Sequence, residues 1–138
     1  MKIFILEDDA TRNALFFQSL IGHDVTAADN VEDAKKLYTE HAPFDVVLLD
    51  HDLGGETYVN SAQENTGAAF CRWLTTPEAK VATFVHSYNP EGAKNMMHIL
   101  VEQKGWQRVT RLPFGLNLLK WLEGLRDAET KGPEGASN

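Results

Sequence analysis

The segment Val46-Val47-Leu48-Leu49 contains only branched apolar residues, and Asp50 follows it directly. A short apolar run with no polar residue on either face is typical of a strand in the middle of a parallel sheet, because helices cover both faces of such a sheet. Successive parallel strands need a crossover connection, which is usually a helix. The segment therefore predicts an α/β domain in which strands and helices alternate.

The rest of the chain shows this alternation. We expect strands at residues 2–7, 24–28, 45–49, 82–85 and 107–112, and helices at residues 11–20, 31–41, 66–74, 90–104 and 116–125. Strict alternation with right-handed crossovers predicts a flavodoxin-like three-layer sandwich, with a five-stranded parallel sheet of order 2-1-3-4-5. Residues 1–127 would form this domain, and residues 128–138 would form a disordered tail.

Composition limits the classes of partner. The chain has 138 residues and a formal net charge of -7, which argues against binding to duplex DNA through clustered Lys and Arg. Cys71 is the single cysteine, so the chain has no intrachain disulfide, which suits a reducing cytoplasm. No apolar run approaches the roughly eighteen residues of a membrane span. We expect a cytoplasmic protein that binds neither duplex DNA nor a membrane.

Ionisable residues follow three of the expected strands. Glu7-Asp8-Asp9 follows the first strand, Asp50-His51-Asp52 follows the third, and His86-Ser87 follows the fourth. The carboxyl ends of parallel strands lie along one edge of the sheet, where open α/β folds bind their ligands. The sequence therefore predicts a single site at this edge.

The residue types in these clusters favour a divalent metal ion. Carboxylate oxygens suit Mg²⁺ or Mn²⁺, which are the metals we expect first, and the imidazoles of His51 and His86 would also allow Zn²⁺ or Fe²⁺. The carboxylates expected to hold the metal are Asp8, Asp9, Asp50 and Asp52.

Most of these residues also have a structural interpretation. Asp8 and Asp9 would cap the first helix if they bound its backbone N–H groups. His51 would point away from Asp50 if the strand continued past Leu49, because neighbouring side chains in a strand face opposite ways. Turn or loop positions would account for Asp52, Ser87 and Asn89.

The layout of these motifs resembles a response-regulator receiver domain. The resemblance rests on the acids after the first strand, on Asp50 after the third, on Ser87 after the fourth and on Pro113-Phe114 after the fifth. It implies that the acids hold Mg²⁺ and that Asp50 accepts a phosphoryl group. Receivers usually carry a lysine before this proline, where the chain has Leu112 next to Arg111.

Two longer motifs are similar to those of the cyclic-phosphate-processing receiver domains. They are Leu49-Asp50-His51-Asp52-Leu53-Gly54, followed by Thr66-Gly67, and the segment from His86 to Met96. This resemblance implies action on a cyclic phosphate of an RNA end or a nucleotide. The expected catalytic residues are Asp50, His86 and His51, and the expected substrate contacts are Ser87, Asn89, Gly54, Thr66 and Tyr58.

We expect a metal-dependent enzyme that hydrolyses a cyclic phosphate. A bound metal would generate hydroxide near neutral pH, and His86 would protonate the leaving alkoxide. Two alternatives stay open. The chain would be a receiver-like signalling module if Asp50 is phosphorylated, or a non-catalytic binder of cyclic nucleotides. The sequence leaves the substrate and the oligomeric state undetermined.

Overall fold

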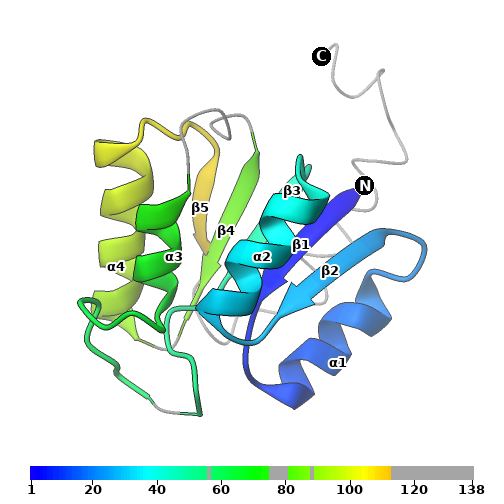
Figure 1. Cartoon of the computed structure of the whole chain (residues 1–138), viewed down its shortest axis with the longest axis horizontal. Helices are drawn as coiled ribbons and strands as arrows, with labels where there is room; N and C mark the ends of the chain where they lie inside the picture. Colours follow the sequence, from blue (N-terminus) through cyan, green and yellow to red (C-terminus); the bar gives the residue numbers. More distant parts are fainter. Residues whose placement is uncertain (56, 75–80, 88, 113–138) are drawn as a thin grey trace.

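The computed structural model describes residues 1–55, 57–74, 81–87 and 89–112 (Figure 1). Five parallel strands form one sheet of order β2-β1-β3-β4-β5, which is the predicted flavodoxin-like order. The strands are β1 (Lys2–Leu6), β2 (Asp24–Ala28), β3 (Val46–Leu49), β4 (Ala82–His86) and β5 (Val109–Leu112). The helices are α1 (Ala10–Ser19), α2 (Val31–His41), α3 (Gly67–Trp73), α4 (Pro90–Met97) and the π-helix η2 (His98–Gln103).

Helices cover both faces of the sheet, because the central strands are apolar on both faces. In β1, Phe4 and Leu6 pack into a core with α2, α3 and α4, whereas Ile3 and Ile5 pack against Phe16 of α1. The residues of β3 alternate in the same way. Figure 1 shows α1 separated from the other helices by the sheet.

Four helices begin at a short polar side chain that accepts a hydrogen bond from the backbone N–H three residues later. Such N-caps satisfy one of the donors that a helix start leaves unpaired. The caps of α1, α2, α3 and α4 are Asp9, Asn30, Thr66 and Asn89. Three of them stand at the carboxyl edge of the sheet among the residues predicted to form the site.

The predicted boundaries need some corrections. The helix expected over residues 90–104 is α-helical only to Met97 and continues as η2, in which the N–H of Lys104 bonds to the carbonyl of Ile99 five residues earlier. The strand expected from residue 107 begins at Val109. The expected helix at 116–125, the tail at 128–138 and Pro113-Phe114 lie outside the described residues. None of the described helices is long and apolar enough to cross a membrane.

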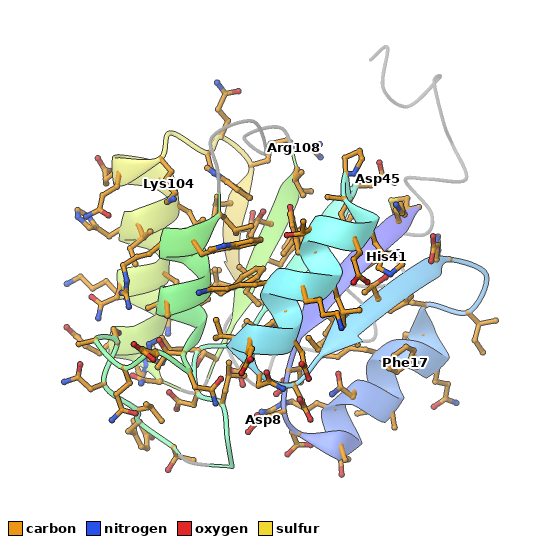
Figure 2. All side chains as sticks on the ribbon, viewed as in Figure 1. Asp8, Phe17, His41, Asp45, Lys104 and Arg108 are labelled. Carbon is orange, nitrogen blue, oxygen red and sulfur yellow. The ribbon has the colours of Figure 1, made fainter. Side chains whose placement is uncertain are left out.

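The predicted site lies at the edge of the sheet that is formed by the carboxyl ends of the strands. Asp8 lies at the carboxyl edge, while Asp45 and Arg108 lie at the opposite edge (Figure 2). At the carboxyl edge, the segment after β3 returns to the sheet through an antiparallel bridge between Asp52 and Thr66. This loop and the start of α1 frame the predicted site.

Candidate functional site

The strand register brings three ionisable side chains together. Leu6 of β1 pairs with Leu49 of β3, and Leu49 pairs with Val85 of β4. The next residues along these three strands are Glu7, Asp50 and His86. They are all buried, which is unusual for ionisable groups unless they are paired.

Glu7 is the centre of this arrangement. Its carboxylate accepts two hydrogen bonds from Arg12, from Nε at 2.6 Å and from Nη2 at 3.0 Å, and Nε2 of His86 lies 3.2 Å from Oε1. Burial acts to raise the pKa of Glu7, but the bonds from His86 and Arg12 outweigh it and hold the pKa well below its ordinary value. Glu7 is therefore a buried carboxylate in an ion-pair network.

Glu7, Asp8 and Asp50, called here the acid triple, each offer one carboxylate oxygen within 4.8 Å of the others. Burial, together with the nearby charge of Glu7, raises the pKa of Asp50 to about 9. The pKa of Asp8 is also raised, again first by burial. A divalent cation would relieve this repulsion, and an all-oxygen donor set fits Mg²⁺ or Mn²⁺.

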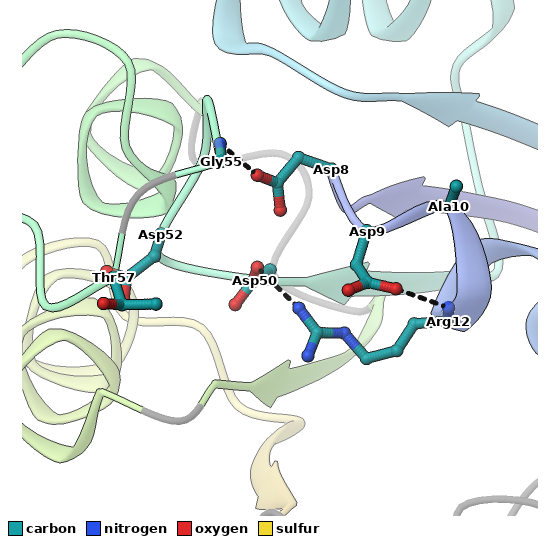
Figure 3. Close-up of a pocket in the computed structure, with 8 residues that line it drawn as sticks. All are labelled: Asp8, Asp9, Ala10, Arg12, Asp50, Asp52, Gly55 and Thr57. Carbon is teal, nitrogen blue, oxygen red and sulfur yellow. Dashed lines mark hydrogen bonds and ion pairs between the residues drawn. The ribbon is translucent and has the colours of Figure 1, made fainter.

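Asp8 and Asp50 of the acid triple line a pocket of ≈ 420 Å³ (Figure 3), whereas Glu7 is fully buried and is not among the lining residues. Arg12 reaches across it from α1, and its Nη2 lies 3.7 Å from Oδ2 of Asp50. The pocket is lined by Asp8, Asp9, Ala10, Arg12, Asp50, Asp52, Gly55 and Thr57. Carboxylates, a guanidinium and a hydroxyl therefore face one open space at the carboxyl edge of the sheet.

The sequence-based ligand set differs from the acid triple at three positions. Glu7 was part of the motif but was not among the expected ligands, although the strand register places it beside Asp50. Asp9 lines the pocket, and its Oδ1 accepts the N–H of Arg12 as the cap of α1. Asp52 also lines the pocket but is not in the acid triple. The roles of Asp9 and Asp52 as metal ligands stay predictions.

Asp52 is occupied by hydrogen bonds. Its carboxylate accepts the N–H groups of Tyr58 at 2.6 Å and Val59 at 3.2 Å, and Nδ2 of Asn89 donates to it at 3.1 Å. Nδ1 of His51 lies 2.7 Å from the same carboxylate. Burial opposes these bonds, but they prevail and lower the pKa of Asp52. Asp52 thus ties the loop after β3 to the start of α4.

His51 is fully buried and is not among the residues that line the pocket. Its ring lies between Asp52 and Ser61, with Nε2 2.9 Å from Oγ of Ser61. The ring also lies against Gly92 of α4, where an added Cβ would come within 2.4 Å of it. The structure therefore gives His51 a packing role, and its predicted catalytic role has no contact with the pocket to support it.

His86 reaches the site through Glu7. Its ring packs on Phe16 with centroids 5.2 Å apart, and its Nδ1 has no hydrogen-bond partner among the described residues. The residue as a whole is only 6% exposed. In this arrangement His86 positions Glu7 and is not among the residues that line the pocket.

The residues predicted to contact the substrate differ in exposure to solvent. Ser87 and Asn89 are buried, and Oγ of Ser87 accepts the N–H of Asn89. Thr66 is the buried cap of α3, and Gly54 has a φ of 79°, which suits a glycine turn. Tyr58 is 71% exposed with a φ of 53°, next to the pocket residue Thr57. Of these, Tyr58 is the one with a side chain free to meet a solute.

Comparisons with known proteins agree with this geometry. Residues 1–102 match the family described as the cyclic-phosphate processing receiver domain. No curated protein matches the chain. Among solved structures, the N-terminal domain of an uncharacterized protein from Wolinella succinogenes has a TM-score of 0.66 at 21% identity, and the match covers 94% of each chain.

Two further structures have the same fold. The chemotaxis protein CheY4 from Vibrio cholerae has a TM-score of 0.63 at 16% identity, covering 91% of this chain and 96% of that one. NtrX from Brucella abortus has a TM-score of 0.62 at 22% identity, covering 94% of this chain and 27% of that one. These likenesses establish the receiver-type fold, and a fold of this kind supports many functions.

Proposed function

Because the chain belongs to the cyclic-phosphate processing receiver family, we propose that it binds a divalent metal ion at the acid triple and hydrolyses a cyclic phosphate on a nucleotide or an RNA end. The observation that carries this proposal is the pocket itself. Asp8 and Asp50, whose carboxylates suit a hard cation, and Arg12, whose guanidinium suits a phosphate, face the same open space. We propose the cytoplasm as the place of action.

The metal would be held by Glu7, Asp8 and Asp50, and Mg²⁺ or Mn²⁺ fits these oxygens better than Zn²⁺ or Fe²⁺. When bound, such an ion polarises a phosphoryl oxygen and lowers the pKa of a coordinated water. Arg12, which contacts both Glu7 and Asp50 in the metal-free protein, would orient the phosphate from the α1 side of the pocket. His86 would keep Glu7 ionised through its 3.2 Å contact.

Hydrolysis of a cyclic phosphodiester adds water across one P–O bond, so the leaving sugar oxygen needs a proton. The side chains at the pocket that carry a proton near neutral pH are limited. Asp50, whose pKa is raised to about 9, holds a proton before a metal binds, but it would be ionised as a metal ligand, so solvent water would supply the proton. His86 would serve as the acid only if its ring turned toward the pocket, since its Nε2 contacts Glu7 and it is not among the residues that line the pocket.

The alternative of phosphorylation on Asp50 is favoured by one observation. Oδ1 of Asp50 accepts the N–H of His51 at 2.8 Å, and Oδ2 faces Arg12 in the pocket. The lysine that receivers usually carry at the end of the fifth strand is replaced here by Leu112, which is buried, and Arg111 is exposed. Arg12 would then be the cation beside the phosphoryl group.

The test is chromatography of a substrate panel incubated with the protein and Mg²⁺, Mn²⁺ or Zn²⁺. The panel contains 2',3'-cyclic mononucleotides, RNA ends with a cyclic phosphate and 3',5'-cyclic nucleotides. We expect metal-dependent product from the wild type and from Asp9→Asn, and none from Asp50→Asn. Turnover retained in Asp50→Asn would refute the assignment.

The same preparations separate the alternatives. Stable labelling by acetyl phosphate in the wild type, but not in Asp50→Asn, would establish the signalling role instead. Recovery of intact cyclic nucleotide bound to the protein, with no product under any metal, would establish a non-catalytic binder.

A further inference from the structure

Arg12 has an unusual position for a cation in a metal-binding pocket. Its guanidinium binds both oxygens of Glu7, and it approaches Oδ2 of Asp50 to 3.7 Å. Glu7 and Asp50 are two of the three members of the acid triple. The side chain therefore occupies two of the carboxylates that a divalent ion would use, and Figure 3 shows its contact with Asp50.

The charges explain this arrangement. The carboxylate of Glu7 is ionised and fully buried, and a buried charge of this kind needs a cation beside it. A guanidinium stays charged at any pH that a protein tolerates. Arg12 thus supplies the positive charge that keeps the acid triple together when no metal is present.

The backbone of Arg12 is fixed, but its side chain has room to move. Its N–H donates to Oδ1 of Asp9 at the first turn of α1, which holds the Cα in place. The side chain is 22% exposed and lines the open pocket. A long flexible side chain on a fixed backbone can reach a new partner in the pocket without unfolding of α1.

The new partner would be an anion. A guanidinium binds phosphate oxygens with two parallel hydrogen bonds, as it binds the carboxylate of Glu7 here. A metal that neutralises Glu7 and Asp50 would remove the reason for Arg12 to stay between them. A phosphate that bridges the metal would then offer the guanidinium a second negative group.

We propose that Arg12 is an exchangeable cation, which holds the acid triple in the metal-free protein and transfers to the phosphate of the substrate when a divalent ion binds. The phosphate part of this inference rests on the proposed function. The consequence is coupling between two ligands, because metal and phosphate each favour the same position of Arg12. Metal binding should therefore tighten phosphate binding, and the reverse.

The first experiment is a Mn²⁺ titration of Arg12→Gln, followed by the magnetic resonance signal of free Mn²⁺. Removal of the competing cation should lower the Kd for Mn²⁺ by about tenfold or more. A tenfold change in Kd corresponds to about 1.4 kcal/mol of binding free energy. Arg108→Gln is the matched control, since this exposed arginine lies at the opposite edge of the sheet (Figure 2), and it should bind Mn²⁺ as the wild type does. Unchanged or weaker binding in Arg12→Gln would overturn the proposal.

The second experiment measures binding of inorganic phosphate by calorimetry, with and without saturating Mn²⁺. In the wild type, Mn²⁺ should tighten phosphate binding by at least about tenfold, and most of this coupling should be lost in Arg12→Gln. Equal coupling in both proteins would contradict the exchange. Arg12→Lys is included in case Arg12→Gln does not fold, because it keeps the charge but loses the two-pronged bond, so its phosphate binding should be several-fold weaker.

Neither experiment depends on turnover. If no cyclic phosphate is hydrolysed but both titrations give the expected changes, the exchange stands and the proposed hydrolysis fails. If hydrolysis is observed and Mn²⁺ affinity does not respond to Arg12→Gln, the exchange fails and the proposed function stands.

Discussion

Glu7 and Asp50 show how two buried carboxylates side by side acquire different properties. Glu7 has Arg12 and His86 as partners, so its pKa falls well below the ordinary value. Asp50 is buried beside the charge of Glu7, and the guanidinium of Arg12 is 3.7 Å away, so its pKa rises to about 9. In the metal-free protein, Glu7 is therefore charged, whereas Asp50 holds a proton until a cation binds.

This difference predicts how the stability of the metal-free protein depends on pH. Since the pKa of Asp50 is raised from 3.8 to about 9, the folded state keeps a proton that the unfolded state loses in this window. The free energy of unfolding should therefore fall as pH rises, by at most about 1.4 kcal/mol per pH unit relative to Asp50→Asn. Urea unfolding of both proteins in EDTA at pH 5, 6, 7 and 8 measures this.

The control for this titration is Asp24→Asn, which changes an exposed acid at the start of β2. The difference in the free energy of unfolding between Asp24→Asn and the wild type should stay constant from pH 5 to pH 8. A constant difference between the wild type and Asp50→Asn would show that Asp50 is charged in the folded, metal-free protein.

At the scale of elements, the site depends on how closely α3 and α4 approach the end of β3. The N–H of Gly67 donates to the carbonyl of His51 at 2.8 Å, and a Cβ on Gly67 would lie 2.1 Å from the carbonyl oxygen of Asp50. Gly92 allows the same close approach of α4 to the ring of His51. Glycine at the first turn of each helix is what allows the loop after β3 to pack beneath them.

Gly67→Ala should therefore be severely destabilising. The added Cβ would lie 2.1 Å from the backbone oxygen of Asp50, which cannot move away cheaply, and 2.6 Å from Cε of Met96. We expect a loss of about 2 kcal/mol or more in the free energy of unfolding, measured by urea denaturation.

Gly22→Ala is the comparison for this substitution. Gly22 has a φ of 95° and open space around its Cα, so the cost there should be about 1 kcal/mol, from backbone strain alone. A smaller loss for Gly67→Ala than for Gly22→Ala would mean that the first turn of α3 is not packed as described.

At the scale of the whole molecule, the acid triple joins residues from β1 and β3, and Arg12 joins α1 to both. A ligand that binds only the folded chain adds to its stability by mass action. Mg²⁺ at one hundred times its dissociation constant should raise the free energy of unfolding by about 2.7 kcal/mol, seen as a higher melting temperature. Asp8→Asn and Asp50→Asn should lose most of this gain.

Asp9→Asn distinguishes the acid triple from the ligand set predicted from sequence. Asn caps a helix about as well as Asp, so α1 should stay intact in this variant. We expect its Mg²⁺-dependent gain in melting temperature to match the wild type. Loss of the gain in Asp9→Asn would establish Asp9 as a metal ligand, as the sequence suggested.

The order of the strands in the sheet could be predicted from the sequence alone. The apolar run at residues 46–49 and the alternation around it predicted a parallel sheet of order 2-1-3-4-5, because hydrophobic periodicity and the handedness of crossovers leave few other arrangements. The same reasoning predicted a site at the carboxyl edge, where the acid triple lies, and the motifs pointed to the family that the comparison established.

Which side chains meet at this edge could not be read from the sequence and depends on the folded chain. Glu7 enters the acid triple because the register of β1 against β3 sets it beside Asp50, and a sequence pattern gives the order of residues but not the alignment of two strands. The ring of His51 packs against Gly92 of α4, and Arg12 extends from α1 into the pocket. The position of His51 follows from packing between segments distant in sequence, and that of Arg12 follows from its bonds to Glu7, five residues earlier, and its contact with Asp50.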